Sequence, residues 1–196
     1  MIQDIFKTSI YKTQLKNPKY IKYFKDALAY EKKKNKEGSQ ITNVGGYQST
    51  TYTGLKNKKI NQEVFLKPAY DFCNLLHPQN LFRICLQSWW MNENSYGDYN
   101  SFHRHTTPTN RVILSGIYYI EAPKDCGRLV FQNFDGGKFN DPNLKYFNDP
   151  NFWSVYYEEP KQYDLIIFPP AVMHMVEPNR SKKKRISVAF NIATLE

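Results

Sequence analysis

After residue 78 the chain changes to short apolar or aromatic runs separated by Gly, Pro, Asn and Asp, without amphipathic helices between them. Strands that follow one another in this way form antiparallel sandwiches or barrels rather than parallel sheets. Residues 133–151 are rich in Asn, Asp, Gly and Pro and are predicted to form a long loop. Loops of that length are commonly lids or binding loops. The predicted strands are residues 82–91, 112–120, 129–131, 163–168 and 186–192.

The chain before residue 78 has a helical pattern instead. Asn17 and Pro18 are typical of a helix start, with Asn as the cap and Pro at the first helical position. A second helix is predicted over residues 61–77, with an uncertain first turn because Pro68 interrupts it. The apolar stripe of the first helix consists of Ile21, Phe24 and Leu28.

The length of 196 residues predicts a single domain, residues 1–196, made of a helical N-terminal part (1–78) and a β core (79–196). No apolar run approaches the roughly 18 to 20 residues of a membrane span, and no apolar signal segment begins the chain. We therefore expect a cytoplasmic protein without a membrane partner. Its cysteines form no metal or redox motif and are predicted to be plain thiols; they are Cys73, Cys85 and Cys126.

The net charge of +9 suggests a nucleic-acid partner, but its distribution argues against one. Residues 1–70 hold fourteen Lys, no Arg and five acidic residues, so they carry the whole surplus, and residues 71–196 are neutral. Guanidinium groups favour bidentate phosphate binding, whereas ammonium groups are strongly hydrated. We therefore interpret the surplus as a solvated basic face, with nucleic acid as the minority alternative.

Two of the four histidines form a pair, His103 and His105, separated by one residue. On a strand, side chains at i and i+2 point to the same face and can bind one ion. His174 follows a predicted strand near the C-terminus and could supply a third ligand, as in iron sites that leave coordination positions open. From the histidines alone, metal binding and ordinary surface polarity both stay open. His77 is predicted to cap the second helix.

Arg185 opens a strand with an alternating pattern, in which Arg185 and Ser187 share one face and Ile186, Val188 and Phe190 share the other. A guanidinium group binds a carboxylate through two hydrogen bonds, and a nearby hydroxyl can add a third. The alternative is that Arg185 only ends the solvated basic run that begins at Lys182.

Taken together, these segments resemble the 2-oxoglutarate- and Fe(II)-dependent oxygenases, specifically a small family found in bacteria and their phages. The resemblance covers about residues 40–193 and is carried by NVGGYQS (43–49), SWWMN (88–92), HRH (103–105), LSGIYYI (114–120), FPPAVMHMVEPN (168–179) and RISVAFN (185–191). It implies a double-stranded β-helix, also called a jelly roll, with the N-terminal helices packed on one sheet and a metal at the open end.

The layout is similar to that of prolyl hydroxylases, which implies Fe(II), 2-oxoglutarate and O2 as cofactors. It further implies that His103, His105 and His174 bind the metal, while Arg185, Ser187 and Tyr119 bind 2-oxoglutarate. The implied reaction hydroxylates an aliphatic C–H bond and releases succinate and CO2. The substrate would be a prolyl or other protein or peptide side chain, or else a small molecule; a homodimer stays open.

One departure concerns the second metal ligand, where the wider superfamily has an acid and this chain has His105. The small family commonly has His–x–His there, but His105 could also lie outside the metal shell; Asp98 is the nearest acid and a poor candidate by spacing. Two alternatives follow: a three-His cupin-like dioxygenase that does not use 2-oxoglutarate, and a basic nucleic-acid-binding module built on residues 1–70.

Overall fold

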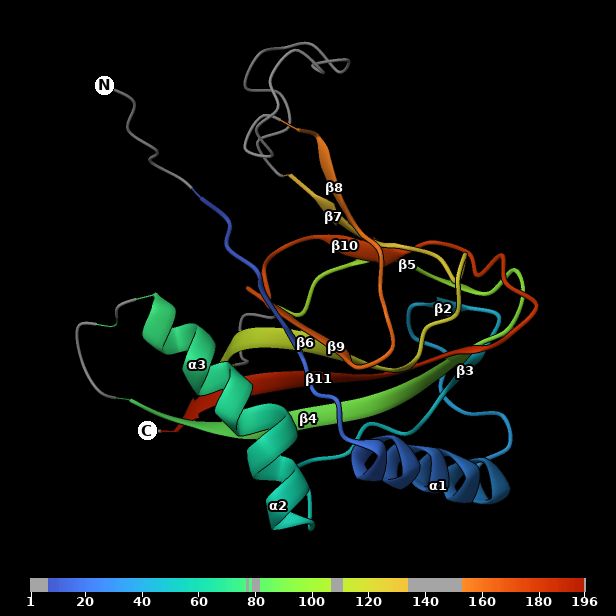
Figure 1. Cartoon of the computed structure of the whole chain (residues 1–196), viewed down its shortest axis with the longest axis horizontal. Helices are drawn as coiled ribbons and strands as arrows, with labels where there is room; N and C mark the ends of the chain where they lie inside the picture. Colours follow the sequence, from blue (N-terminus) through green and yellow to red (C-terminus); the bar gives the residue numbers. More distant parts are fainter. Residues whose placement is uncertain (1–6, 77, 79–81, 107–110, 134–152, 196) are drawn as a thin grey trace.

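The computed structural model describes residues 7–76, 78, 82–106, 111–133 and 153–195 (Figure 1). Apart from Asn133, the loop predicted over residues 133–151 lies outside this part of the chain, and so does His77 with its predicted capping role.

Two antiparallel sheets face each other in the described part of the chain, and Figure 1 shows them as two layers. The larger has the order β1 (Tyr11–Gln14), β9 (Asp164–Phe168), β6 (Val112–Glu121), β11 (Arg185–Leu195), β4 (Arg83–Asn94) and β3 (Tyr47–Gln48). The smaller has the order β2 (Asn43–Val44), β5 (Tyr99–His103), β10 (His174–Val176), β7 (Leu129–Gln132) and β8 (Val155–Glu158). The predicted antiparallel sandwich is confirmed.

The larger sheet uses its two faces differently, as the alternation in β11 predicts. Ile186, Val188 and Phe190 belong to a core cluster shared with the helices, whereas Arg185 and Ser187 line a cavity on the opposite face. A second, smaller core cluster lies between the sheets and contains Ile117, Tyr119, Leu129, Phe131, Ile166, Phe168 and Val176. The functional cavity is therefore inside the sandwich.

The helices cover the outer face of the larger sheet (Figure 1); they are α1 (Pro18–Lys34), α2 (Lys58–Ile60), the π-helical η1 (Asn61–Leu66) and α3 (Lys67–Leu75). Asn17 caps α1 by accepting the Lys19 N–H at 3.0 Å, as predicted. The predicted stripe of α1 is buried, and Phe24 packs its ring 6.0 Å from the ring of Trp89 on β4.

Pro68 explains the π-helical turn in the second helical segment. Proline has no N–H, so the carbonyl four residues before it loses its usual donor. Just before Pro68, the N–H of Lys67 bonds to the carbonyl of Gln62, five residues back, which is the π-helical pattern. The helical segment predicted over 61–77 thus exists, with an interrupted start that begins three residues earlier.

The N-terminal part is not purely helical, which corrects the division expected from the sequence. It also supplies β1, β2 and β3, and β1 pairs with β9 to extend the larger sheet. Its strands pair into the two sheets and its helices pack against the larger sheet. We therefore propose that residues 1–196 form a single domain. Within the described residues, no helix is long and apolar enough to cross a membrane.

Candidate active site

A bulge in β5 points His103 into the sandwich. Along β10, His174 and Val176 are two residues apart, but their partners on β5, His103 and Asn100, are three apart. The additional residue shifts the alternation of β5, so that Asn100 and His103 line the same cavity despite their odd spacing. A regular strand would have pointed one of them outward.

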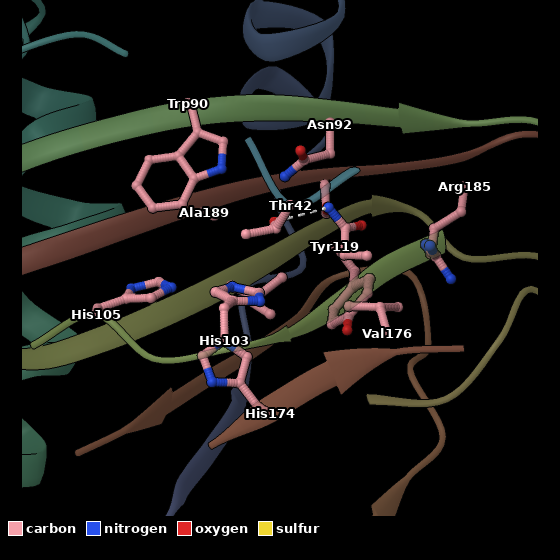
Figure 2. Close-up of a pocket in the computed structure, with 13 residues that line it drawn as sticks. Thr42, Trp90, Asn92, His103, His105, Tyr119, His174, Val176, Arg185 and Ala189 are labelled. Atoms are coloured by element: carbon pink, nitrogen blue, oxygen red, sulfur yellow. Dashed lines mark hydrogen bonds between the residues drawn. The ribbon is translucent and has the colours of Figure 1, made fainter. Parts of the chain in front are cut away.

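His103, His105 and His174 come together at one end of the smaller sheet, as Figure 2 shows. Their ring centroids lie 4.3 Å (His103–His174), 5.1 Å (His105–His174) and 5.2 Å (His103–His105) apart. One nitrogen from each ring lies within 4.8 Å of the other two, as a shared metal ion requires. Among the described residues, this group contains no carboxylate.

Hydrogen bonds place the proton of each ring on Nδ1, because an oxygen of a carbonyl or an amide can only accept. Nδ1 donates to the Ser101 carbonyl at 2.8 Å in His103 and to the Val172 carbonyl at 2.9 Å in His174. In His105 it donates to Oδ1 of Asn191 at 2.7 Å. This tautomer leaves Nε2 unprotonated, as metal coordination requires.

Burial keeps these imidazoles neutral. Desolvation lowers the pKa of His174 to about 3 and of His105 to about 4, and it lowers the pKa of His103 as well. Neutral imidazole is a good ligand for iron and for other divalent transition metals. The donor set therefore fits an Fe(II) ion, and no competing protonation occurs near neutral pH.

Arg185 is almost completely buried, with 1% of its surface exposed. Its Nη1 donates to the backbone carbonyls of Cys126 and Glu177, the latter at 3.2 Å, and Nη2 has no partner among the described residues. Gly127 makes this arrangement possible, because a Cβ there would lie 2.8 Å from Nη1. Arg185 thus presents a buried positive charge whose hydrogen-bond partners are neutral, and burial lowers its pKa.

Two more buried polar atoms on the cavity wall lack a partner within the described chain: the Tyr119 hydroxyl and Oδ1 of Asn92. Burial raises the pKa of Tyr119, so its phenol stays protonated and can donate a hydrogen bond. Leaving buried polar atoms unpaired costs free energy, and such atoms commonly mark a ligand site.

All six residues predicted from the sequence line this one cavity: His103, His105, His174, Tyr119, Arg185 and Ser187. Asp98 does not: its carboxylate accepts the Ser95 N–H at 2.7 Å and lies where Gly45 and Gly46 have no side chain. His105 rather than Asp98 therefore completes the histidine group.

Sequence reasoning missed four polar or aromatic wall residues: Thr42, Trp90, Asn92 and Asn100. The period of two along β4 places Trp90 and Asn92 on one face, so this signal could have found them. Asn100 needs the bulge and Thr42 needs the pairing of β2 with β5, and neither is readable from sequence.

A family model described as "Putative 2OG-Fe(II) oxygenase" matches residues 88–191, more than half of the chain. The chain belongs to this family of 2-oxoglutarate- and Fe(II)-dependent oxygenases. The protein is thus an oxygenase whose cofactors are Fe(II), 2-oxoglutarate and O2, and its three-histidine group fits the metal. No curated protein sequence matches the chain.

Solved structures with the same fold include a Pseudomonas putida prolyl-4-hydroxylase, with a TM-score of 0.60, 16% identity and coverage of 96% of this chain and 94% of that chain. A Trichoplax adhaerens prolyl hydroxylase in complex with a hypoxia inducible factor peptide fragment has a TM-score of 0.60, 14% identity and coverage of 95% and 83%. The carbocyclase SnoK from nogalamycin biosynthesis has a TM-score of 0.64, 12% identity and coverage of 95% and 79%. The predicted double-stranded β-helix is confirmed.

Proposed function

We propose that His103, His105 and His174 coordinate Fe(II) in a facial arrangement. Arg185 binds the far carboxylate of 2-oxoglutarate with help from Tyr119 and Ser187. The protein would then hydroxylate an aliphatic C–H bond of its substrate, with 2-oxoglutarate converted to succinate and CO2.

The observation that carries this assignment is Nη2 of Arg185, which is buried without a partner among the described residues, while Arg185 lines the same cavity as the histidines. A desolvated positive charge with only carbonyl partners is costly, and an anionic ligand would offset that cost. A carboxylate can accept from Nη2 of Arg185 and from the Tyr119 hydroxyl at once. 2-Oxoglutarate has a carboxylate at its far end and a keto-acid end that can face the histidines.

Bound Fe(II), with 2-oxoglutarate and O2, supplies the oxidising chemistry. The residues of this chain position the metal and the cosubstrate and shield them from water. The Nδ1 protons keep the three rings oriented toward the metal, and the Arg185 charge fixes the cosubstrate. Apolar side chains shield His174 from water: the ring of Phe168 lies 4.7 Å from that of His174, and Phe131 lies 6.2 Å from it and 5.0 Å from Phe168.

For the substrate we propose a prolyl or other side chain of a protein or peptide. The support is the fold shared with prolyl hydroxylases, of which one is in complex with a peptide. A small-molecule substrate is the second candidate, because the carbocyclase SnoK from nogalamycin biosynthesis has the same fold. A panel of prolyl peptides and free amino acids, tested for substrate-stimulated succinate formation, would separate the two.

Anaerobic titration with Fe(II) and then 2-oxoglutarate tests the assignment. We expect a weak visible charge-transfer band in the wild type, and loss of the band in Arg185→Gln at 2-oxoglutarate concentrations that saturate the wild type. Lys184→Gln is the matched control, because it removes the adjacent positive charge, which is about half exposed and pairs with Glu93. A folded, iron-loaded wild type without the band would contradict the proposal. Turnover that needs no 2-oxoglutarate and survives Arg185→Gln would favour the three-His cupin-like alternative.

A further inference from the structure

A polar row crosses the inner face of the larger sheet beneath the histidines. In the strand register, Asn191 on β11 pairs directly with Ser88 on β4 and with Ser115 on β6. Ser115 is fully buried, although the inner face around this row is mainly apolar. Ser88 and Asn191 are partly buried. Buried polar groups are costly unless they satisfy one another, so the hydrogen-bond partners of these three side chains matter.

The Asn191 amide is hydrogen-bonded on both sides by this row. Oδ1 accepts from the Ser115 hydroxyl at 2.8 Å and from Nδ1 of His105 at 2.7 Å, while Nδ2 donates to the Ser88 hydroxyl at 3.1 Å. The amide therefore accepts on the side of His105. If it were turned over, its NH2 group would face Nδ1, and the proton of His105 would have to move to Nε2.

His105 differs in this respect from the other two histidines. The Nδ1 protons of His103 and His174 go to backbone carbonyls, which no side-chain substitution removes. Only His105 has its tautomer set by a side chain, and that side chain is 86 positions away in the sequence.

We propose that Asn191, anchored by hydrogen bonds to Ser115 and Ser88, is a positioning residue that commits His105 to metal binding through Nε2. This inference rests on the proposed function for the role of His105. It adds that His105, which stands where the wider superfamily has an acid, binds the metal tightly when a hydrogen-bond acceptor occupies position 191. Hydrogen-bond partners of metal-ligating residues typically contribute about 10- to 100-fold to metal affinity.

The experiment measures anaerobic Fe(II) and Co(II) affinity by calorimetry, together with the visible spectrum of the Co(II) protein. Asn191→Leu removes the acceptor at similar volume, and Asn191→Asp restores it. We expect roughly 10- to 100-fold weaker metal binding and an altered Co(II) spectrum for Asn191→Leu, with recovery in Asn191→Asp. In a His105→Ala background, Asn191→Leu should have no further effect on affinity.

Nitrogen NMR of the imidazole rings in the metal-free protein reads the tautomer directly. We expect the Nδ1–H form for His105 in the wild type and in Asn191→Asp. If Asn191→Leu does not fold, Ser115→Ala decides instead: it frees the amide to turn and should give a mixture of tautomers. Ser49→Ala is its matched control, a fully buried hydroxyl that bonds to the Met91 N–H of β4 outside the cavity wall.

The inference is overturned if folded Asn191→Leu binds metal as tightly as the wild type, or if Asp at position 191 fails to restore binding. It is likewise overturned if Ser115→Ala leaves the His105 tautomer unchanged when Asn191→Leu cannot be studied. A wild type that binds no metal would instead contradict the proposed function, and the NMR measurement would still test the tautomer.

Discussion

The Lys-rich N-terminal part and the histidine-bearing cavity treat polar groups in opposite ways. In residues 1–70 charges are abundant and near the surface, and many are paired: Lys22 with Asp26, Lys32 with Glu93 and Lys67 with Asp71 are examples. In the cavity charges are few and buried, and three of the four buried side-chain atoms without a partner among the described residues lie on its wall. The candidate active site is therefore marked by buried polar atoms without partners, and the number of charges in a region is a poor guide to it.

The largest expected effect breaks the metal site. Replacing His174 by Ala should weaken Fe(II) binding by more than about 100-fold and abolish 2-oxoglutarate-dependent succinate formation, because losing a ligand costs more than losing its hydrogen-bond partner. Calorimetry and a succinate assay measure both. Lys22→Ala, which breaks an exposed ion pair on α1, is the contrast and should leave both unchanged. Comparable losses of Fe(II) binding and succinate formation in the two variants would contradict the assignment of function to the cavity rather than to the N-terminal part.

A large stability effect is expected where the two regions meet. Phe24 is fully buried among the rings of Phe65, Trp89 and Tyr118. Phe24→Ala should lower the free energy of unfolding by about 3–5 kcal/mol, because it leaves a cavity between helix and sheet. Urea denaturation measures the change, with the exposed Tyr30→Ala as control. A change below about 1 kcal/mol would mean that α1 contributes little to the sheet.

Removal of the buried Arg185 charge should weaken the affinity for 2-oxoglutarate selectively. Arg185→Gln should raise the Kd of 2-oxoglutarate by roughly 10- to 150-fold, equivalent to about 1.5–3 kcal/mol for hydrogen bonds to a charged group. The affinity for Fe(II) alone should change little, because Arg185 does not belong to the group of three histidines that could hold the metal. Calorimetry with each ligand in turn makes the comparison. An equal loss of both affinities would point to a collapsed cavity.

The smallest effect concerns Glu93 on β4, which pairs with Lys32 of the N-terminal part and with Lys184 outside the cavity. Burial alone would raise its pKa, but the Lys184 and Lys32 ammonium groups lower it overall. A lowered folded-state pKa means that the stabilisation is present above the unfolded-state pKa of about 4.5 and is lost as the pH falls below it. Glu93→Gln should therefore cost about 1 kcal/mol at pH 7 and much less at pH 3. Thermal unfolding at both pH values measures the difference, and Asp26→Asn should show a smaller one.

The sequence indicated the class of fold through local periodicity, and it indicated the site residues through the resemblance of their motifs to a known family. The alternation of β11 put Arg185 and Ser187 on one face, and the apolar strands without helices between them favoured an antiparallel sandwich or barrel. The motif order was enough to indicate the family. Six short strands escaped prediction because pairing, rather than composition, defines them: β1, β2, β3, β5, β8 and β10.

Only the tertiary structure decided which polar groups are left without partners. The bulge in β5 turns His103 inward, and strand pairing brings Asn191 to His105 across 86 residues. The guanidinium of Arg185 is buried against carbonyls rather than against an acid, which no residue pattern reveals. Periodicity tells which side of a strand a residue faces, because it follows from local geometry. Hydrogen-bond satisfaction depends on partners distant in sequence, so it is fixed only when the chain has folded.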